Sequence, residues 1–374
     1  MKKLFLVAVF ICFFLSGCCF NSDKREVIRF STWGSASEMS ILRPIISDFE
    51  KMNPDIKVEV LHIPQDYFQK LHLLFASKTE PDVMLINNQN IPVYAKFLTD
   101  MSDSFDKNFY FEKSISTVSF QGKVYAIPRD CSGLVVYYNI DKFRQKKLPL
   151  PTSKWTVEDM IAIAQKLTDK DCFGISYEPS IYYAHPFINY YGGGLFLLKD
   201  GETRFVGNTY QSRVGIFVYK ELAYLHKCAP TPSQVGSKTL AQMFIDGEIA
   251  MHISGRWLVP KYRDVLKFDW DVVNFPEYSA PSDASGWAIS VRTKHKESAL
   301  RFVKYLSSKE NIEKFTQSGL IVPARKDVAC SNVFMQGKPC AKVFIDSVEK
   351  SPVTVVSSEF NKKVELLNEE YFSE

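Results

Sequence analysis

The chain has 374 residues, of which 46% are hydrophobic and 24% are charged, the composition of an ordinary globular protein. At a soft prior of about 150 residues per domain, this length predicts two domains. The formal net charge of +4 falls to +2 without Lys2 and Lys3, which belong to an expected signal segment. A chain this close to neutral lacks the concentrated basic face of nucleic-acid binders, so we expect no nucleic-acid partner.

The first residues have the pattern of a bacterial lipoprotein signal. Lys2 and Lys3 precede an apolar run of 12 residues, Leu4 to Leu15, which is shorter than the roughly 20 residues of a membrane-spanning helix. The string LSGC, ending at Cys18, resembles a lipobox, in which cleavage precedes a cysteine that carries lipid. We expect residues 1–18 to form this signal, and the mature protein to be exported and lipid-anchored to the bacterial cell membrane, on its periplasmic face or the cell surface. An ordinary secretory signal with a chance cysteine is the alternative.

The first part of the mature chain alternates between strand and helix patterns. Apolar residues recur at helical spacing between Glu38 and Met52, and the run IKVEVL beginning at Ile56 alternates like a strand. We expect strands at residues 27–31, 56–61 and 83–86, and helices at residues 38–52, 67–77 and near 93–98. This order predicts an α/β fold with a mainly parallel sheet, whose ligand would lie beyond the carboxyl ends of the strands.

The segment GKVYAIPRDCSGLVVYYN, from Gly122 to Asn139, is interpreted as two short strands with a polar connector between them. Its apolar runs are Val124 to Ile127 and Leu134 to Tyr138, and Pro128 marks the start of the connector. We expect this connector to be a crossing between two lobes, with the ligand against it.

The α/β pattern repeats after this connector. Thr156 is expected to cap a clearly amphipathic helix. We expect helices at residues 156–166, 212–226, 242–246, 297–307 and 309–317, and strands at residues 173–175, 249–253, 270–274 and 286–291. Residues 286–291 would return the chain to the first lobe, and residues 319–323 would cross again. The tail from Asn332 to Phe372 is expected to be largely helical.

Short strings spread in order over nearly the whole mature chain carry a family resemblance. They include FEKMNPDIKVEV at residues 49–60, PDVMLIN at 81–87, GKVYAIP at 122–128, LVVYYNIDKF at 134–143, FIDGEIAMHISGRW at 244–257 and ESALRFVKYLSSKE at 297–310. Their order and spacing resemble the family 1 extracellular solute-binding proteins of bacterial ABC importers, the group that includes maltose-binding protein. The resemblance implies a protein that captures a small-molecule ligand between two lobes, delivers it to permease subunits and carries out no chemistry.

The same resemblance implies a two-lobe periplasmic-binding-protein-like fold of type II, an α/β class. Each lobe would have a mainly parallel sheet flanked by helices, and the lobes would close as a hinge through about three crossings. The implied N-lobe is residues 25–127 plus 288–324, the implied C-lobe is residues 134–284 plus 328–374, and the crossings are residues 128–133, 285–287 and 325–327. We expect a monomer that needs no cofactor.

Four aromatic residues are candidates for contact with a carbohydrate, whose weakly apolar ring face needs an aromatic platform. Trp257 follows the Ser-Gly turn where the resemblance implies a stacking aromatic. Tyr182 precedes an aromatic run where maltose-binding protein carries a stacking tyrosine. Trp33 follows the first strand, and Trp287 lies at an expected crossing. The alternative for these residues is packing in the core or between the lobes.

Planar polar side chains would hydrogen-bond the sugar hydroxyls. Asn87 and Asn88 follow the third expected strand, although such residues are also typical of a turn. Arg129, Asp130 and Ser132 lie in the connector and are expected to contact the ligand. Their alternative is an internal Arg129–Asp130 pair or a set of hinge hydrogen bonds.

Three arginines at expected cleft edges leave a charged ligand open. Arg129, Arg256 and Arg325, the last of which follows the third crossing, would suit an anion through bidentate hydrogen bonds. A neutral carbohydrate is the first expectation, and glycerol-3-phosphate, a glycerophosphodiester or a sugar phosphate is the second. A surface receptor or adhesin on the same fold is a further alternative, since fold does not fix function.

Sequence patterns of common enzyme and metal sites are missing. No GxSxG or HExxH string occurs, and no cysteine or histidine cluster has metal-ligand spacing, so we expect neither an enzyme nor a metal site. An exported hydrolase with paired carboxylates is the remaining enzymatic alternative. The exported compartment permits disulfides, and Cys330 and Cys340 are a candidate pair, with free buried thiols as the alternative. Pairing cannot be read from sequence among Cys19, Cys131, Cys172, Cys228, Cys330 and Cys340.

Overall fold

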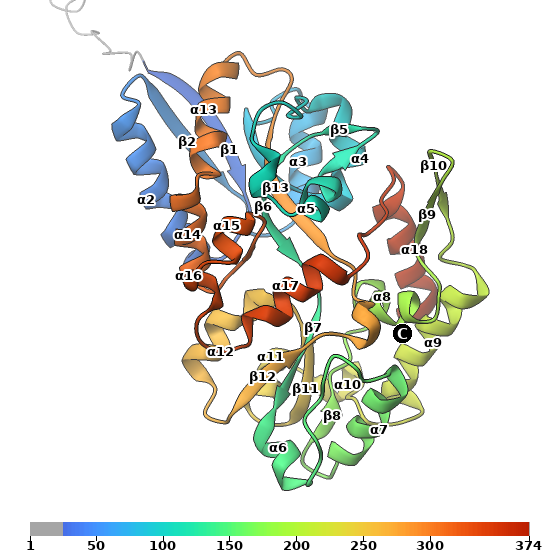
Figure 1. Cartoon of the computed structure of the whole chain (residues 1–374). Helices are drawn as coiled ribbons and strands as arrows, with labels where there is room; N and C mark the ends of the chain where they lie inside the picture. Colours follow the sequence, from blue (N-terminus) through green and yellow to red (C-terminus); the bar gives the residue numbers. More distant parts are fainter. Residues whose placement is uncertain (1–24, 374) are drawn as a thin grey trace, which may run out of the picture.

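The computed structural model describes residues 25–373, so the expected signal segment, Cys18 and Cys19 lie outside the described residues. The described chain forms two α/β lobes, one above the other in Figure 1. The upper lobe is built on a six-stranded sheet and the lower lobe on a four-stranded sheet. Among these residues, no helix combines the length and apolar character that crossing a membrane requires.

The upper sheet has the strand order β14-β6-β13-β3-β1-β2. β1 pairs in parallel with β2 and β3, whereas β13 runs antiparallel to β3 and β6, and β14 runs antiparallel to β6. Its strands are β1 (Glu26–Thr32), β2 (Ile56–His62), β3 (Val83–Asn87), β6 (Ile127–Ser132), β13 (Asp283–Ile289) and β14 (Val322–Pro323). The helices of this lobe are α2 (Ala36–Met52), α3 (Tyr67–Ala76), α4 (Ile91–Tyr94), α5 (Glu112–Thr117), α13 (Lys296–Leu306) and α14 (Lys309–Gln317), with a small hairpin of β4 (Ser119–Phe120) and β5 (Lys123–Val124).

The lower sheet has the strand order β12-β7-β11-β8, in which only β11 and β8 are parallel. Its strands are β7 (Val135–Asn139), β8 (Phe173–Ile175), β11 (Ile249–Ser254) and β12 (Trp270–Val273). The helices of this lobe are α6 (Ile140–Gln145), α7 (Val157–Leu167), α8 (Ile181–Tyr190), α9 (Tyr210–Tyr224), α10 (Pro232–Val235), α11 (Leu240–Ile245) and α12 (Val259–Val265), with a hairpin of β9 (Phe196–Lys199) and β10 (Glu202–Phe205).

The C-terminal helices connect the two lobes. α15 (Lys326–Ala329) and α16 (Asn332–Met335) lie against α14 of the upper lobe. α17 (Ala341–Lys350) packs on α16 and α5, and it crosses the region between the lobes in Figure 1. α18 (Phe360–Phe372) packs on α8 of the lower lobe and also reaches the 3-10 helix η1 (Asn88–Asn90) of the upper lobe.

The helix starts follow from capping residues in the sequence. The Ser35 side chain accepts a hydrogen bond from the Glu38 backbone at 3.2 Å, which satisfies one free amide at the start of α2. At α7, Thr156 and Asp159 form a reciprocal capping box, as expected for Thr156. Both helices bury one apolar face, on which Phe49 of α2 is an example.

One apolar core continues from the upper lobe into the lower lobe. It includes Phe30 and Leu85 on the upper sheet and Tyr137 on β7, and Phe334 and Phe344 join it from α16 and α17. Separate cores fill the remaining parts of the lower and upper lobes. The lobes are therefore connected by packed side chains as well as by the backbone.

The structure corrects several expectations about secondary structure. The polar connector expected at residues 128–133 is largely strand β6, because Asp130 and Cys131 are paired to β13 on one side and β14 on the other. The residues of the second expected crossing, 285–287, lie inside strand β13 of the upper sheet. Both sheets are mixed and not mainly parallel, since returning strands β13 and β7 pair antiparallel with their neighbours. The lobe boundaries and the places of the crossings implied by the resemblance stay a prediction.

Candidate ligand-binding cleft

A cavity of about 500 Å³ lies between the two lobes. Its upper wall comes from the turn between β1 and α2, the end of β3, β6 and the start of β13. Its lower wall comes from the start of α8 and the 3-10 helix η4 (Arg256–Leu258). Eight of the ten predicted site residues line the cavity. These are Trp33, Asn87, Asn88, Arg129, Asp130, Ser132, Tyr182 and Trp257.

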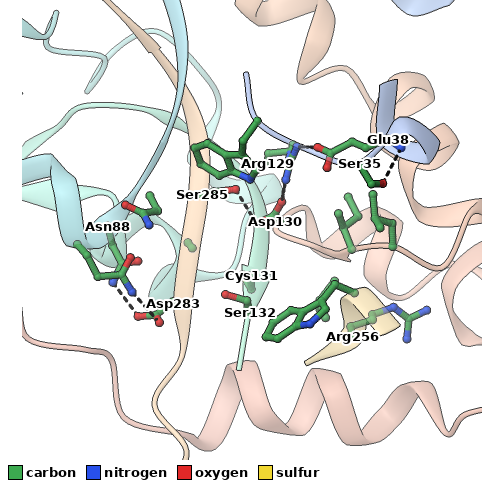
Figure 2. Close-up of a pocket in the computed structure, with 18 of the residues that line it drawn as sticks. Ser35, Glu38, Asn88, Arg129, Asp130, Cys131, Ser132, Arg256, Asp283 and Ser285 are labelled. Carbon is green, nitrogen blue, oxygen red and sulfur yellow. Dashed lines mark hydrogen bonds and ion pairs between the residues drawn. The ribbon is translucent and has the colours of Figure 1, made fainter. Parts of the chain in front are cut away.

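A buried ion network forms one side of this cleft. Arg129 donates from Nε to Asp130 Oδ2 at 2.5 Å and from Nη1 to Glu38 Oε1, so one guanidinium meets two carboxylates. Ser285 donates to the other oxygen of Asp130 at 2.8 Å, as Figure 2 shows. Burial by itself would lower the pKa of Arg129, but the carboxylates of Asp130 and Glu38 outweigh burial and raise that pKa. The internal Arg129–Asp130 pair, considered as an alternative from sequence, is present.

A second polar cluster lies in the same upper wall, on the side of Asn88 and Asp283 in Figure 2. Asn88 donates from Nδ2 to Asp283 Oδ1 at 2.8 Å, and Gln89 donates from Nε2 to Asp283 Oδ2 at 2.9 Å. Burial raises the pKa of the Asp283 carboxyl, while the two amide donors oppose that rise. Within residues 25–373, Asp283 forms no ion pair, so this second cluster carries no compensating cation.

Three aromatic side chains border the same cleft. The half-buried Trp33 packs edge-on against Tyr67, with ring centroids 4.9 Å apart. Tyr182 and Trp257 are 37% and 39% exposed, so each leaves a ring available to a ligand. The Trp257 ring folds back over Gly255, where an added Cβ would lie 1.9 Å from a ring carbon. A ring that borders a polar cleft is a platform for the apolar face of a ligand.

Two predicted site residues are not in the cleft. Trp287 is fully buried, because β13 runs from the cleft into the upper sheet and places this residue against Phe30, with ring centroids 5.5 Å apart. The expectation that Trp287 faces the ligand is therefore wrong. Arg325 does not line the cleft either. It occupies the N-cap position of α15, and its Nε and Nη2 atoms donate to the two carboxylate oxygens of Asp327 at 3.0 and 2.7 Å.

Arg256 lines the cleft, but its charged end lies elsewhere. The guanidinium carbon sits 4.2 Å from the ring centroid of Phe334 and 4.8 Å from that of Phe344. In Figure 2 the side chain points away from Asp130 and Asn88. Burial lowers the pKa of Arg256 to about 10, and its Nε and Nη1 atoms have no hydrogen-bond partner among the described residues. The three arginines expected at the cleft edges therefore do not converge on one ligand.

Sequence reasoning missed five polar residues of the cleft, the first of which is Ser35, the N-cap of α2. Glu38 comes from the first turn of α2, and Gln89 follows the two predicted asparagines. Asp283 and Ser285 lie in the buried strand β13, inside the string SDASGW. The rest of this strand is made of small and apolar residues, and a buried carboxylate or hydroxyl needs a hydrogen-bond partner. The polar pair in an apolar strand was therefore the sequence signal that could have marked Asp283 and Ser285 as site residues.

Cysteines and metal ligands add nothing to this site. The five described cysteines are free, so the candidate pair of Cys330 and Cys340 is wrong. Cys131, Cys172 and Cys228 are buried thiols, as the alternative had it. Over residues 25–373, no group of three or more histidine, cysteine, aspartate or glutamate side chains is arranged to hold a metal ion.

Comparisons with known proteins agree with this architecture. The chain matches the bacterial extracellular solute-binding protein family over residues 45–339. It is 26% identical to the maltodextrin-binding protein MdxE of Bacillus subtilis, with 87% of this chain and 81% of that protein covered. It is 24% identical to the galactooligosaccharide-binding protein of Bacillus subtilis, with 86% and 78% covered.

Among solved structures, the chain resembles an ABC substrate-binding protein from Listeria monocytogenes in complex with cycloalternan. The TM-score is 0.84 at 25% identity, with 93% of this chain and 92% of that chain covered. The two-lobe α/β fold expected from sequence is confirmed, and so is the expectation of a receptor that binds solutes without converting them. The chain belongs to the bacterial extracellular solute-binding protein family.

Proposed function

We propose that this protein is the substrate-binding component of an ABC importer and captures a carbohydrate in the cleft between its lobes. The observation that carries the proposal is the combination of Trp33, Tyr182 and Trp257 with the hydrogen-bonding groups of the upper wall. Sugars need both, because each ring has a weakly apolar face and a rim of hydroxyls. The relatives named for maltodextrin and galactooligosaccharides, and the neighbour bound to cycloalternan, support the same ligand class.

The charges of the cleft favour a neutral ligand over an anionic one. Arg129 already meets two carboxylates, Glu38 and Asp130. Arg256 turns its guanidinium between two phenylalanine rings, and Asp283 adds a further acidic group to the upper wall. A phosphate entering this cleft would lose its hydration shell without gaining a free cation. Glycerol-3-phosphate, a glycerophosphodiester or a sugar phosphate is therefore the second candidate.

In this proposal the lobes close as a hinge over the ligand, and the closed monomer docks on its permease. The ligand contacts are Asn87, Asn88, Asp130 and Ser132 as hydrogen-bonding groups, together with the aromatic residues, while Arg129 orients Asp130. Closure should reduce the radius of gyration measured by X-ray scattering when ligand is added. Tight binding of a ligand without a change in the radius of gyration would contradict the hinge. If, in addition, the protein does not bind a permease, a surface receptor would be favoured.

The same proposal includes a lipid anchor on Cys18, which would keep the receptor at the membrane. A Cys18→Ser variant expressed in a bacterial host should move from the membrane fraction to the soluble exported fraction. A Cys19→Ser variant is the matched control and should stay with the membrane. Membrane association that survives Cys18→Ser would reject the lipobox interpretation.

A thermal-shift screen tests the ligand class directly. The panel contains maltodextrins, galactooligosaccharides, cycloalternan, glycerol-3-phosphate and glycerophosphodiesters. A neutral oligosaccharide should raise the melting temperature in a concentration-dependent way, because it binds the folded state alone. Stabilisation by the phosphorylated compounds only would establish the second candidate instead. If no carbohydrate in the panel stabilises the protein, the proposed function is rejected.

A further inference from the structure

A second cavity, of about 420 Å³, adjoins the ligand cleft beside Tyr182. The two cavities share the walls formed by Asn87, Gln89, Tyr182 and Asp283. A substituent on a ligand held in the cleft would enter this second space by passing the Tyr182 ring. We call the second cavity the side chamber.

Most of the remaining wall of the side chamber is apolar. Phe68 of α3 contributes from the upper lobe, and Ile181 of α8 and Leu195 contribute from the lower lobe. Phe360 and Val364 come from α18, which packs against α8 and also reaches the upper lobe. Aromatic and aliphatic side chains from both lobes thus enclose the space.

The amide groups of the side chamber are already hydrogen-bonded to one another or to Asp283. Asn361 donates from Nδ2 to Asn90 Oδ1 at 3.0 Å, and Asn90 donates from Nδ2 to Asn87 Oδ1 at 2.8 Å. Gln89 donates from Nε2 to Asp283 Oδ2 at 2.9 Å. Outside these bonds the wall offers only the His185 imidazole and the Thr354 and Tyr182 hydroxyls. These are fewer polar groups than the hydroxyls and ring oxygen of a hexose, so part of a sugar ring placed here would be buried without partners, which is unfavourable.

The chamber also lacks a cation. His185 of α8 is buried, and burial lowers its pKa to about 4, so the imidazole is neutral near pH 7. The acidic group on the shared wall, Asp283, has both oxygens bonded to amides. An anionic group would find no cationic side chain in this wall, whereas an uncharged apolar group would lose only water.

We propose that the side chamber binds an uncharged apolar substituent, an aryl or alkyl aglycone, of a carbohydrate held in the cleft. The physiological ligand is then a glycoside with a polar and an apolar end, and not a free oligosaccharide alone. Tyr182 lies at the junction of the two compartments and contacts both ends of the ligand. This inference rests on the proposed carbohydrate function and narrows its ligand class.

The test compares matched ligands by isothermal titration calorimetry. The probes are the methyl and 4-nitrophenyl glycosides of maltotriose and of galactobiose, together with free maltotetraose. Transfer of an aromatic ring into an apolar chamber should tighten binding of the 4-nitrophenyl glycoside at least about tenfold over its methyl partner. Val364→Phe should reduce this difference, because the larger ring takes up the part of the chamber next to α18. Leu366→Phe is the control on the same helix, since Leu366 is 48% exposed and lies outside both cavities.

The possible outcomes separate the inference from the proposed function. Methyl and 4-nitrophenyl glycosides that bind with equal affinity would overturn the side-chamber inference and leave carbohydrate binding intact. Maltotetraose and the 4-nitrophenyl glycoside are each compared with the methyl glycoside of maltotriose. If both gain the same affinity, and Val364→Phe reduces both gains, the chamber is a sugar site and the inference is overturned as well. Failure of every glycoside and of maltotetraose to bind would reject the proposed carbohydrate function and the inference with it.

Discussion

Gly255 is expected to control ligand affinity through the position of the Trp257 ring. An alanine Cβ at residue 255 would lie 1.9 Å from one ring carbon and 2.3 and 2.4 Å from two others. Carbon atoms in contact stay about 3.5–4.0 Å apart, so the ring would have to move by more than about 1.5 Å. The backbone of Gly255, at φ −102° and ψ 179°, suits alanine, and the three closest contacts of the new Cβ are all with this ring.

The size of the effect follows from what the ring contributes. A stacking aromatic at a desolvated contact is worth about 1–2 kcal/mol, which is about 5- to 30-fold in affinity. Gly255→Ala should weaken binding of the best carbohydrate by this factor and change the free energy of unfolding by less than about 1 kcal/mol. Calorimetric titration measures the first quantity, and urea unfolding monitored by circular dichroism measures the second.

A double-mutant cycle decides whether the effect passes through the ring. Trp257→Ala alone should weaken binding to a similar extent, and adding Gly255→Ala to it should have little further effect. Gly194→Ala is the control, because its Cβ would meet other atoms no closer than 3.7 Å and Gly194 does not line the cleft. Wild-type affinity in Gly255→Ala, or additive losses in the double variant, would refute this reasoning.

Three further predictions concern stability. Arg129→Met should lower the free energy of unfolding by about 3–5 kcal/mol in urea titrations, because it strands two buried carboxylates; a loss below about 1 kcal/mol would count against the buried network. The pKa of His185 in the folded state is about 4, below the unfolded value of about 6.5, so protonation favours the unfolded chain and stability falls as the pH drops through this window. His185→Phe should flatten the dependence of unfolding free energy on pH by up to about 1.4 kcal/mol per pH unit, and an unchanged slope would exclude His185 as the cause. Gly174→Ala should reduce stability by about 1–3 kcal/mol in thermal melts, since its Cβ would lie 1.8 Å from the Ala164 carbonyl oxygen, and a wild-type melting temperature would contradict that close packing.

Much of the cleft was predictable because its residues follow recognisable strands. Asn87 and Asn88 end β3, and Trp33 follows β1, so their strand ends bring them to the same edge of the upper sheet. Trp257 follows β11 after a Ser-Gly turn, and it lines the same cavity from the lower lobe. Strand ends can be read from local patterns of apolar and turn residues, which is why these positions were found.

The errors arose where a residue's role depends on its neighbours across the sheet. Trp287 looks like a cleft aromatic in sequence, yet it is two residues too far along β13 and packs in the core. Arg325 looks like a cleft cation, yet Asp327 follows it closely enough to pair with it. Asp283 is the opposite case, since its place in the cleft became visible only with its partners from η1.

The sequence by itself determined the α/β class, the order of the main helices and strands, and the family, because these depend on local periodicity and on strings in a fixed order. Only the tertiary structure decided the charge of the cleft. Arg129 and Glu38 are 91 residues apart in the chain, and Asn88 and Asp283 are 195 apart, so neither pairing leaves a local pattern to read. The guanidinium that sequence offered as a receptor for an anion is held by two carboxylates, and this long-range contact favours the neutral ligand that was expected first over the anionic alternative.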